Sequence, residues 1–294
     1  MIKLPEKLRY LNSEGEELVF WDKAPFYYEK KEGFDAVETN VNTFRNYNQD
    51  GESLLSKNLG VRNPIIEGTV IGETLEEFYE LRKKMISVLN HTLSGTLIYE
   101  NDNGSYEIDV IPEIVTFVEN EFEVRTQDYR ITWLALDPYW RDSTFYNSLI
   151  PLSTVVEKLE FPLFITNEFE FATITSGDII EIKNNGDVEV GAIFYMRFVG
   201  SVVNPRIYNV LTQEYFGFEG TFTPDTEFKI STIKGAKEVV KTHVGKSSNA
   251  MSSRIQDSTF LTLRKGTNYL QVQAERGTNA TLVDVSFKPL VLGV

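Results

Sequence analysis

The stretch Tyr129-Arg-Ile-Thr-Trp-Leu-Ala-Leu-Asp-Pro-Tyr-Trp140 lies almost at the midpoint of the 294-residue chain. Its first eight residues form a long apolar run of the kind that buried strands show. Pro138 ends the run, because proline lacks the backbone N–H of a ladder and restricts Asp137 before it. The sequence on either side differs in charge and in the spacing of its strand-like runs. We therefore expect two β-rich halves that meet at Asp137-Pro-Tyr-Trp140.

The composition suits two compact, β-rich cores. A chain of this length is typical of about two domains, and the hydrophobic fraction of 41% is enough to fill them. The 20 Phe and 14 Tyr favour strands. The absence of Cys excludes disulfides and thiolate metal sites. We expect no signal peptide and no membrane span, so the chain is predicted to be made and folded in the cytoplasm.

Charge is distributed unevenly along the chain. Residues 1–150 hold 15 Lys/Arg against 27 Asp/Glu, whereas residues 151–294 hold 14 against 16. An acidic first half argues against binding along a phosphate backbone, which needs clustered Lys and Arg. This excess is typical of a solvated surface, and it also suits the wall of a channel that conducts DNA without holding it.

One helix and one hairpin stand out in the first half. Thr74 to Leu89 places Phe78 and Met85 on one helical face, and Thr74 with Glu77 forms a capping box. Asn101-Asp-Asn-Gly104 separates two strand-like runs and predicts a β-hairpin. The polar segment Asn40 to Lys57 fits either an exposed loop or a long β-hairpin arm that orders against a partner.

The second half has short strand-like runs with turn signals between them and no competing helical period. This pattern predicts an all-β sandwich. The runs are 178–182, 192–198, 227–231, 260–263, 269–273 and 280–287. Residues 1–145 are thus predicted to form the first domain, 146–158 a linker and 159–294 the second domain.

No set of residues predicts catalysis or a bound metal or cofactor. His91 follows the predicted helix and His243 lies in the other half, so neither has an evident catalytic partner. Two acidic groups, Glu119 with Glu123 and Glu168 with Glu170, are candidates for a carboxylate pair by count alone. Aromatic residues of the second half such as Tyr208, Tyr215 and Phe216 are interpreted as core or interface residues, with sugar stacking as the alternative.

Taken together, these pieces resemble the distal tail proteins of long-tailed, siphovirus-type bacteriophages. In the first half, the resemblance rests on Gln49-Asp-Gly51, Arg62, Ile65 to Ile71, the predicted helix and the Asp137-Pro138-Tyr139-Trp140 hallmark. In the second half, Ile182 to Val188, Asn204-Pro205, Phe228 to Thr232 with Gly235, and Leu263 to Asn268 follow in family order. The resemblance extends over most of the chain.

The resemblance implies a mainly β fold with two parts. The first would be a belt β-sandwich with one α-helix, related to tail-tube proteins, and the second a galectin-like β-sandwich. It further implies a hexameric ring around the DNA channel at the virion tail tip. Such a ring would join the tail tube and tape-measure proteins to the baseplate and receptor-binding proteins, with DNA passing through unbound.

Two other functions remain open from the sequence. A carbohydrate-binding module for the host cell wall would use the second half, and a cell-wall hydrolase would need a carboxylate pair. For Asp137, Pro138, Tyr139 and Trp140 we predict a structural role. Pro138 is expected to stop the last strand of the first half, and Tyr139 and Trp140 to anchor the junction on its core.

Overall fold

The computed structural model describes residues 6–118, 125–144, 149–157, 172–175 and 177–294. The chain divides into two compact units. Unit 1 combines residues 1–144 with residues 290–294, and unit 2 comprises residues 145–289. This differs from the predicted division in two places. The last five residues return to unit 1, and the predicted linker 146–158 contributes strands to unit 2.

The fold is mainly β, as the sequence predicts. The strands of unit 1 are β1 (Lys7–Asn12), β2 (Glu17–Phe20), β3 (Phe26–Glu32), β4 (Thr39–Phe44), β5 (Ser53–Leu59), β6 (Ile65–Ile71), β7 (Gly95–Asn101), β8 (Gly104–Val118), β9 (Thr126–Leu134), β10 (Trp140–Asp142) and β27 (Leu290–Val291). The one α-helix in the described residues is α1 (Leu75–Val88).

The main sheet of unit 1 runs in the order β2-β1-β7-β8-β9-β6-β3. A parallel bridge joins Trp21, just after β2, to Tyr27 of β3, so the two ends of this path meet. The Trp21 N–H donates to the Phe26 carbonyl, and the Trp21 carbonyl accepts from the Tyr28 N–H. The sheet therefore closes on itself, which removes the free edges that open sheets expose.

An aromatic core fills unit 1. Trp133 lies 6.0 Å from Tyr10 and 6.3 Å from Phe20 between ring centroids. The Tyr129 hydroxyl crosses the sheet to donate to the Tyr27 carbonyl at 2.9 Å. Gly68 makes room for it, because a Cβ at that position would lie 2.7 Å from the hydroxyl oxygen. The apolar run that ends at Leu136 thus supplies the centre of this core.

Helix α1 begins as the sequence predicts. The Thr74 hydroxyl accepts from the Glu77 N–H at 3.1 Å, and the Glu77 carboxylate accepts from the Glu73 N–H at 2.8 Å. These bonds satisfy backbone donors that a helix start leaves open. Phe78, Met85 and Val88 are buried against the sheet, which confirms the predicted apolar face.

Unit 2 is built from short antiparallel strands. They are β11 (Ile150–Pro151), β12 (Thr154–Glu157), β13 (Ala172–Thr175), β14 (Ile179–Asn184), β15 (Val190–Gly191), β16 (Ile193–Phe198), β17 (Val202–Val203), β18 (Arg206–Asn209), β19 (Tyr215–Gly217), β20 (Thr221–Phe222), β21 (Thr226–Ser231), β22 (Glu238–His243), β23 (Lys246–Asn249), β24 (Thr262–Leu263), β25 (Gly266–Gln273) and β26 (Thr281–Ser286). Short 3-10 turns lie at Met251–Ser253 and Thr278–Ala280.

Two larger sheets organise unit 2. One has the order β11-β26-β16-β21-β22-β23 and the other β14-β25-β18-β19. Both contribute buried side chains, such as Phe194 and Val283 from the first and Ile207 and Leu270 from the second. Six phenylalanines add ring contacts, the closest being Phe218 stacked on Phe228 at 3.9 Å. The all-β prediction for the second half is therefore confirmed, and most predicted runs match a strand.

Candidate assembly surfaces

The described residues contain no cluster of His, Asp and Glu that could hold a metal ion. The two histidines lie in different units. His91 lines a surface groove, and His243 Nδ1 lies 3.1 Å from the Thr226 hydroxyl in unit 2. The candidate acidic groups Glu119 with Glu123 and Glu168 with Glu170 lie outside the described residues. In the described part of the chain, no helix is long and apolar enough to cross a membrane.

The Asp137-Pro-Tyr-Trp140 segment leads from the end of β9 into β10. The Asp137 carboxylate accepts from the Tyr139 N–H at 3.3 Å, which makes a local turn. Trp140 then pairs with Val291 of β27. Its ring is fully buried and stacks on Phe34 at 5.3 Å between centroids. The structure therefore places Trp140 in the core of unit 1, against the returning C-terminal strand.

Arg62 binds three segments that are distant in sequence. Its side chain is only 2% exposed, and it donates four hydrogen bonds to backbone carbonyls. Nε donates to Pro138 at 2.8 Å, and Nη2 donates to Leu292 at 2.6 Å. Nη1 donates to Gly33 at 2.8 Å and to Asp35 at 2.7 Å. The planar guanidinium offers several donors in a fixed fork, so one side chain fixes all these loops.

The surroundings of Arg62 are tightly built. Burial lowers the pKa of Arg62 to about 10, and the negative charge of Asp35 opposes this shift. The guanidinium still carries its charge at neutral pH, and each of its nitrogens has a carbonyl partner. Gly33 has a positive φ of 75°, and a Cβ there would lie 2.2 Å from the Asn63 carbonyl oxygen. Only glycine fits this approach without a shift of the backbone.

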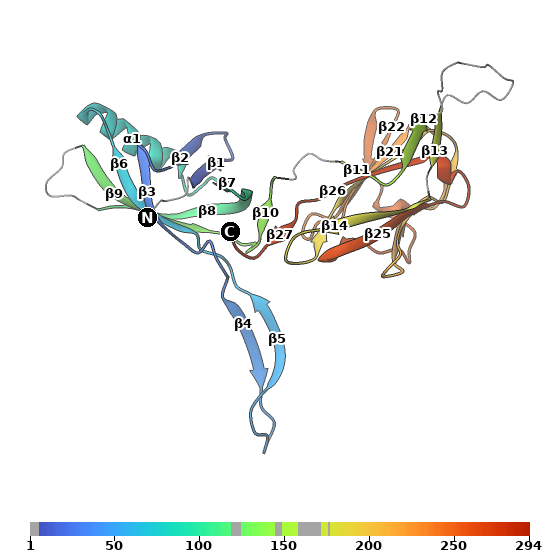
Figure 1. Ribbon diagram of the computed structural model, residues 1–294, viewed down its shortest axis with the longest axis horizontal. Coiled ribbons are helices and arrows are strands. Elements are labelled where there is room, and N and C mark those ends of the chain that lie inside the picture. The colour runs from blue at the N-terminus through green and yellow to red at the C-terminus, as the bar shows by residue number, and fades with distance from the viewer. Residues whose placement is uncertain (1–5, 119–124, 145–148, 158–171, 176) are drawn as a thin grey trace. The chain divides into compact units, whose positions relative to one another are not determined.

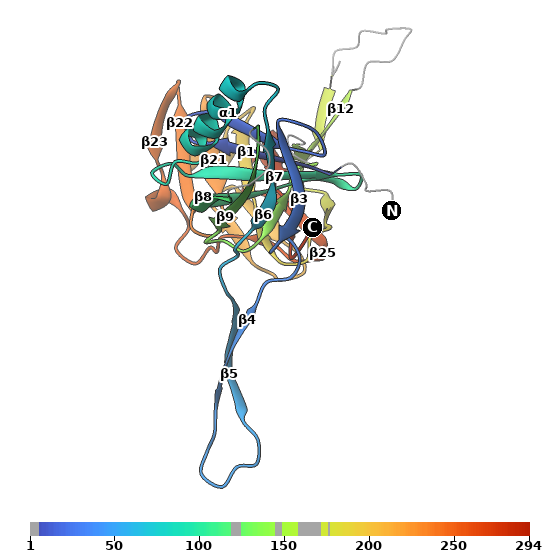
Figure 2. The same ribbon diagram turned by 90° about the vertical axis from the view of Figure 1, so that its left-hand side faces the viewer.

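The β4–β5 hairpin forms a long arm that extends from the closed sheet of unit 1 (Figures 1 and 2). Six residue pairs join its strands, from Thr39 with Leu59 to Phe44 with Ser53. At its base the Gly60 N–H donates to the Glu38 carbonyl at 2.9 Å. At its tip Tyr47 is 96% exposed. Asn40 to Lys57 therefore forms a hairpin rather than a loop, and its ordering by a partner stays a prediction.

The two faces of this arm differ in chemistry. Cross-strand partners share a face, so Asn40 with Asn58 and Asn42 with Ser56 form a mainly polar face. Phe44, which pairs with Ser53, adds one exposed aromatic ring to that face. A register shift leaves Leu55 without a partner residue. Leu54 and Leu55 therefore join Val41 on the opposite face.

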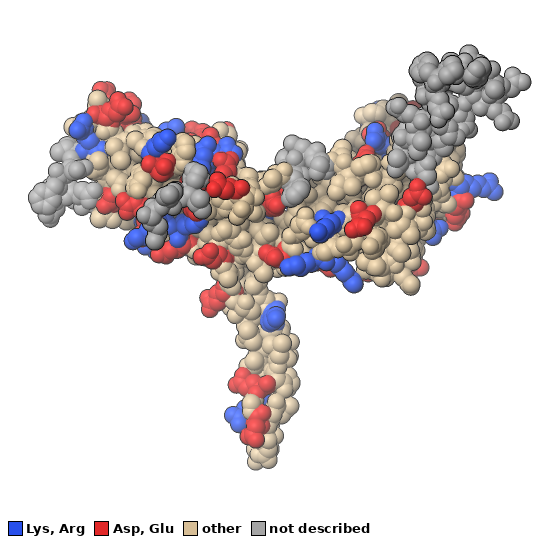
Figure 3. All heavy atoms as spheres, viewed as in Figure 1, with Lys and Arg blue, Asp and Glu red and all other residues tan. Residues whose placement is uncertain are grey.

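On that face Leu54 is 60% and Leu55 68% exposed. Figure 3 shows charged side chains near the base and near the tip of the arm, with an uncharged stretch between them. An isolated two-stranded hairpin with an uncovered apolar face is marginal in water. The arm therefore has the character of an interaction surface.

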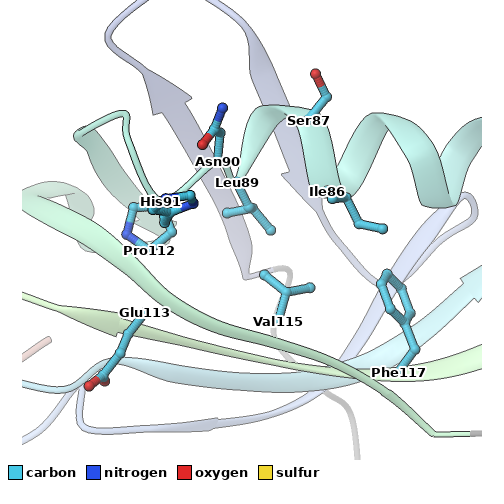
Figure 4. A pocket seen from close by; sticks show the side chains of 9 residues that line it. All are labelled: Ile86, Ser87, Leu89, Asn90, His91, Pro112, Glu113, Val115 and Phe117. Carbon is cyan, nitrogen blue, oxygen red and sulfur yellow. The ribbon is translucent and has the colours of Figure 1, made fainter.

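A second exposed apolar surface lies between α1 and β8. Ile86 and Leu89 point from the helix toward Val115 and Phe117 of β8 (Figure 4). The hollow between them has a volume of about 540 Å³ and is lined at one end by His91. Ile86 is 54% exposed although it lies beside the buried face of α1. We call this surface the α1–β8 groove.

Sequence reasoning missed the role of Arg62 and the return of the C-terminus. Arg62 is one of 29 basic residues and follows no motif of its own that marks it as buried. The sequence marks it only by its place in the family resemblance and by its position just before a buried strand. From the sequence, residues 290–294 are assigned to the second half, because no pattern near them predicts a strand pairing with Trp140.

Comparisons with known proteins match both units. The family model of the phage tail protein RIFT-related domain matches residues 13–132. The model of the siphovirus-type tail component, C-terminal domain, matches residues 185–289. The fold and these matches define the chain as a structural component of a phage tail. More particularly, the chain belongs to the family of siphovirus distal tail proteins. A search of curated proteins found no match.

Solved structures share this fold along nearly the whole chain. The crystal structure of SPP1 Dit (gp 19.1), described as a paradigm of the hub adsorption apparatus in phages that infect Gram-positive bacteria, is 13% identical. It has a TM-score of 0.66 and covers 95% of this chain and 98% of its own.

A chain of the phage p2 baseplate in its activated conformation with Ca is 12% identical, with a TM-score of 0.54. That match covers 97% of this chain and 98% of the baseplate chain. These likenesses extend the family resemblance from separate motifs to the complete two-unit fold.

Proposed function

We propose that this protein is the structural hub of a siphovirus tail tip, where six copies form a ring around the DNA channel. The ring joins the tail tube and tape-measure proteins to the baseplate and receptor-binding proteins. The observation that carries the proposal is the pair of tail-component matches, one in each unit and in family order. The SPP1 relative, whose fold this chain shares, is described as part of a hub.

Two physical features support a structural role. The first is that unit 1 exposes apolar side chains on the arm and beside the α1–β8 groove, which suit contacts between proteins. The second is the acidic excess of residues 1–150, which keeps a surrounding wall from adhering to DNA. In this proposal unit 1 is the ring-forming belt and unit 2 a galectin-like module that receives the outer partners.

Electron microscopy of the purified full chain tests this proposal. We expect rings with six-fold symmetry and a central hole wide enough for a DNA duplex, at protein concentrations of tens of micromolar. Addition of the tail tube protein should stack tubes on one face of the ring. Single particles of the size of one chain, with no ring in either sample, would contradict the proposal.

A second function, binding of a cell-wall saccharide, is favoured by one face of unit 2. Tyr208 of β18 pairs in register with Tyr215 and with Gln271, so the three share the outer face of the β14-β25-β18-β19 sheet. Their side chains are half-buried, and the Arg206 guanidinium lies 5.6 Å from the Tyr215 ring. Aromatic rings beside amide and guanidinium groups are suited to stack on and bind sugars.

Binding of the full chain to purified host cell walls tests this second function. Tyr208→Ala should reduce the bound fraction several-fold, whereas Tyr195→Ala, at a half-buried position on the other sheet, should leave it unchanged. Equal binding by both variants, or none by the parent protein, would remove the saccharide hypothesis and leave the hub intact.

A further inference from the structure

The arm and the α1–β8 groove are both apolar, and both are uncovered in the described structure. In unit 1 the exposed large apolar side chains include Val41, Leu54 and Leu55 on the arm and Ile86 beside the groove. Removing such side chains from water favours association, so each surface gains from a partner. The arm extends away from the closed sheet of unit 1, so that sheet does not cover it.

The two surfaces match in length. The groove follows β8 from Pro112 to Phe117, which is about 20 Å at ~3.3 Å per residue. Strand β4 of the arm, Thr39–Phe44, has the same number of residues and therefore a similar length. A flat ribbon of two strands fits along a groove between a helix and a strand, with its leucines against Ile86 and Val115.

The two surfaces also complement each other in charge. Lys57 pairs in register with Val41, so it lies on the apolar face of the arm. Glu113 lines the groove, and its carboxylate points away from the apolar floor at the rim (Figure 4). Neither Lys57 nor Glu113 forms an ion pair with another described residue. A docked arm brings a free cation to a rim that holds a free anion, which favours one register of docking.

We propose that the apolar face of the β4–β5 arm docks into the α1–β8 groove of a second copy of this chain. Each copy gives its arm to one neighbour and receives an arm from the other. Such head-to-tail contacts use two different patches and close into a ring when the rotation between copies allows it. The inference rests on the proposed ring and names the surfaces that hold it together.

Engineered cysteines test this docking directly, because the natural chain has none. Leu55→Cys and Ile86→Cys are placed in one full-length chain and oxidised, with Asn42→Cys plus Ile86→Cys as the control on the polar face of the arm. We expect the first pair to give a ladder of disulfide-linked multimers. The control should give at least tenfold fewer linked multimers. A disulfide needs Cα atoms roughly 4.4–6.8 Å apart, and a cysteine on the polar face would point away from the groove.

The outcomes separate the docking from the ring itself. Rings in which the Leu55–Ile86 pair links no better than the control would overturn the docking and leave the proposed hub standing. A protein that stays monomeric, with neither rings nor disulfide-linked multimers, would overturn both the docking and the proposed hub.

Charge reversal gives an independent measurement. Lys57→Glu and Glu113→Lys should each weaken assembly roughly 3–10-fold, and the double variant should restore it. Additive weakening in the double variant would contradict the proposed register.

Discussion

The Arg62–Trp140 region and the β4–β5 arm belong to the same unit but differ in burial and in the range of their contacts. Around Arg62, segments from four parts of the chain meet, and every guanidinium nitrogen has a carbonyl partner. On the arm, Leu54 and Leu55 are exposed, and contacts are almost all local. The first region completes a core, whereas the second requires another molecule. The difference predicts that mutations in the first region change stability and mutations in the second change assembly.

Trp140→Ala should have the largest effect on stability. The indole is fully buried against Phe34, so its removal leaves a cavity. We expect the free energy of unfolding to fall by about 3–5 kcal/mol. Trp140→Phe keeps an aromatic ring and should cost less than half of that. Urea unfolding followed by tyrosine and tryptophan fluorescence measures both. A variant that unfolds and assembles like the parent would show that the Asp137-Pro-Tyr-Trp140 segment is only a spacer.

Arg62→Met should have the next largest effect. The substitution removes four hydrogen bonds and leaves buried carbonyls without donors, whereas the removal of a buried charge offsets part of this cost. We expect the free energy of unfolding to fall by about 2–4 kcal/mol. Arg141→Met is the matched control. Arg141 is bonded to carboxylates rather than to backbone carbonyls and lies partly in solvent, so its loss should lower the free energy of unfolding by no more than about 1 kcal/mol. Equal costs in the two variants would refute the anchoring role of Arg62.

A smaller effect is expected at alkaline pH from the core of unit 1. Burial raises the pKa of Tyr10 to about 12, above its ordinary value of 10.0. The unfolded chain therefore loses this proton first, so the free energy of unfolding falls as the pH rises from about 10 to about 12. Tyr10→Phe has no proton to lose and should flatten this part of the pH profile. An unchanged slope in the variant would assign the alkaline loss to other groups.

The smallest effect on stability should come from the arm. Leu54→Ser with Leu55→Ser alters two exposed side chains and should change the free energy of unfolding by no more than about 0.5 kcal/mol. The same change should abolish ring formation, because it removes the apolar face. Asn42→Ser on the polar face is the control and should leave both properties intact. Loss of stability equal to that of Trp140→Ala would show that the arm is part of the core.

The contrast also explains what could be predicted from the sequence. Helix α1 and the β7–β8 hairpin were predicted because their signals are local, as in Thr74 with Glu77 and in Asn101 to Gly104. The β4–β5 arm remained one of two alternatives, because its polar composition also suits a loop. Arg62 and the C-terminal β27 depend on contacts between segments up to 230 positions apart, and no local pattern encodes them. The predicted end of the first domain therefore lacked residues 290–294.

The oligomeric mass of the full chain in solution tests the central claim most directly. Six copies of the 33.6 kDa chain give a mass of about 200 kDa. Light scattering during size-exclusion chromatography should show this mass for the parent protein and a single chain for the Leu54→Ser, Leu55→Ser variant. A parent protein that remains at 33.6 kDa at tens of micromolar would contradict the account.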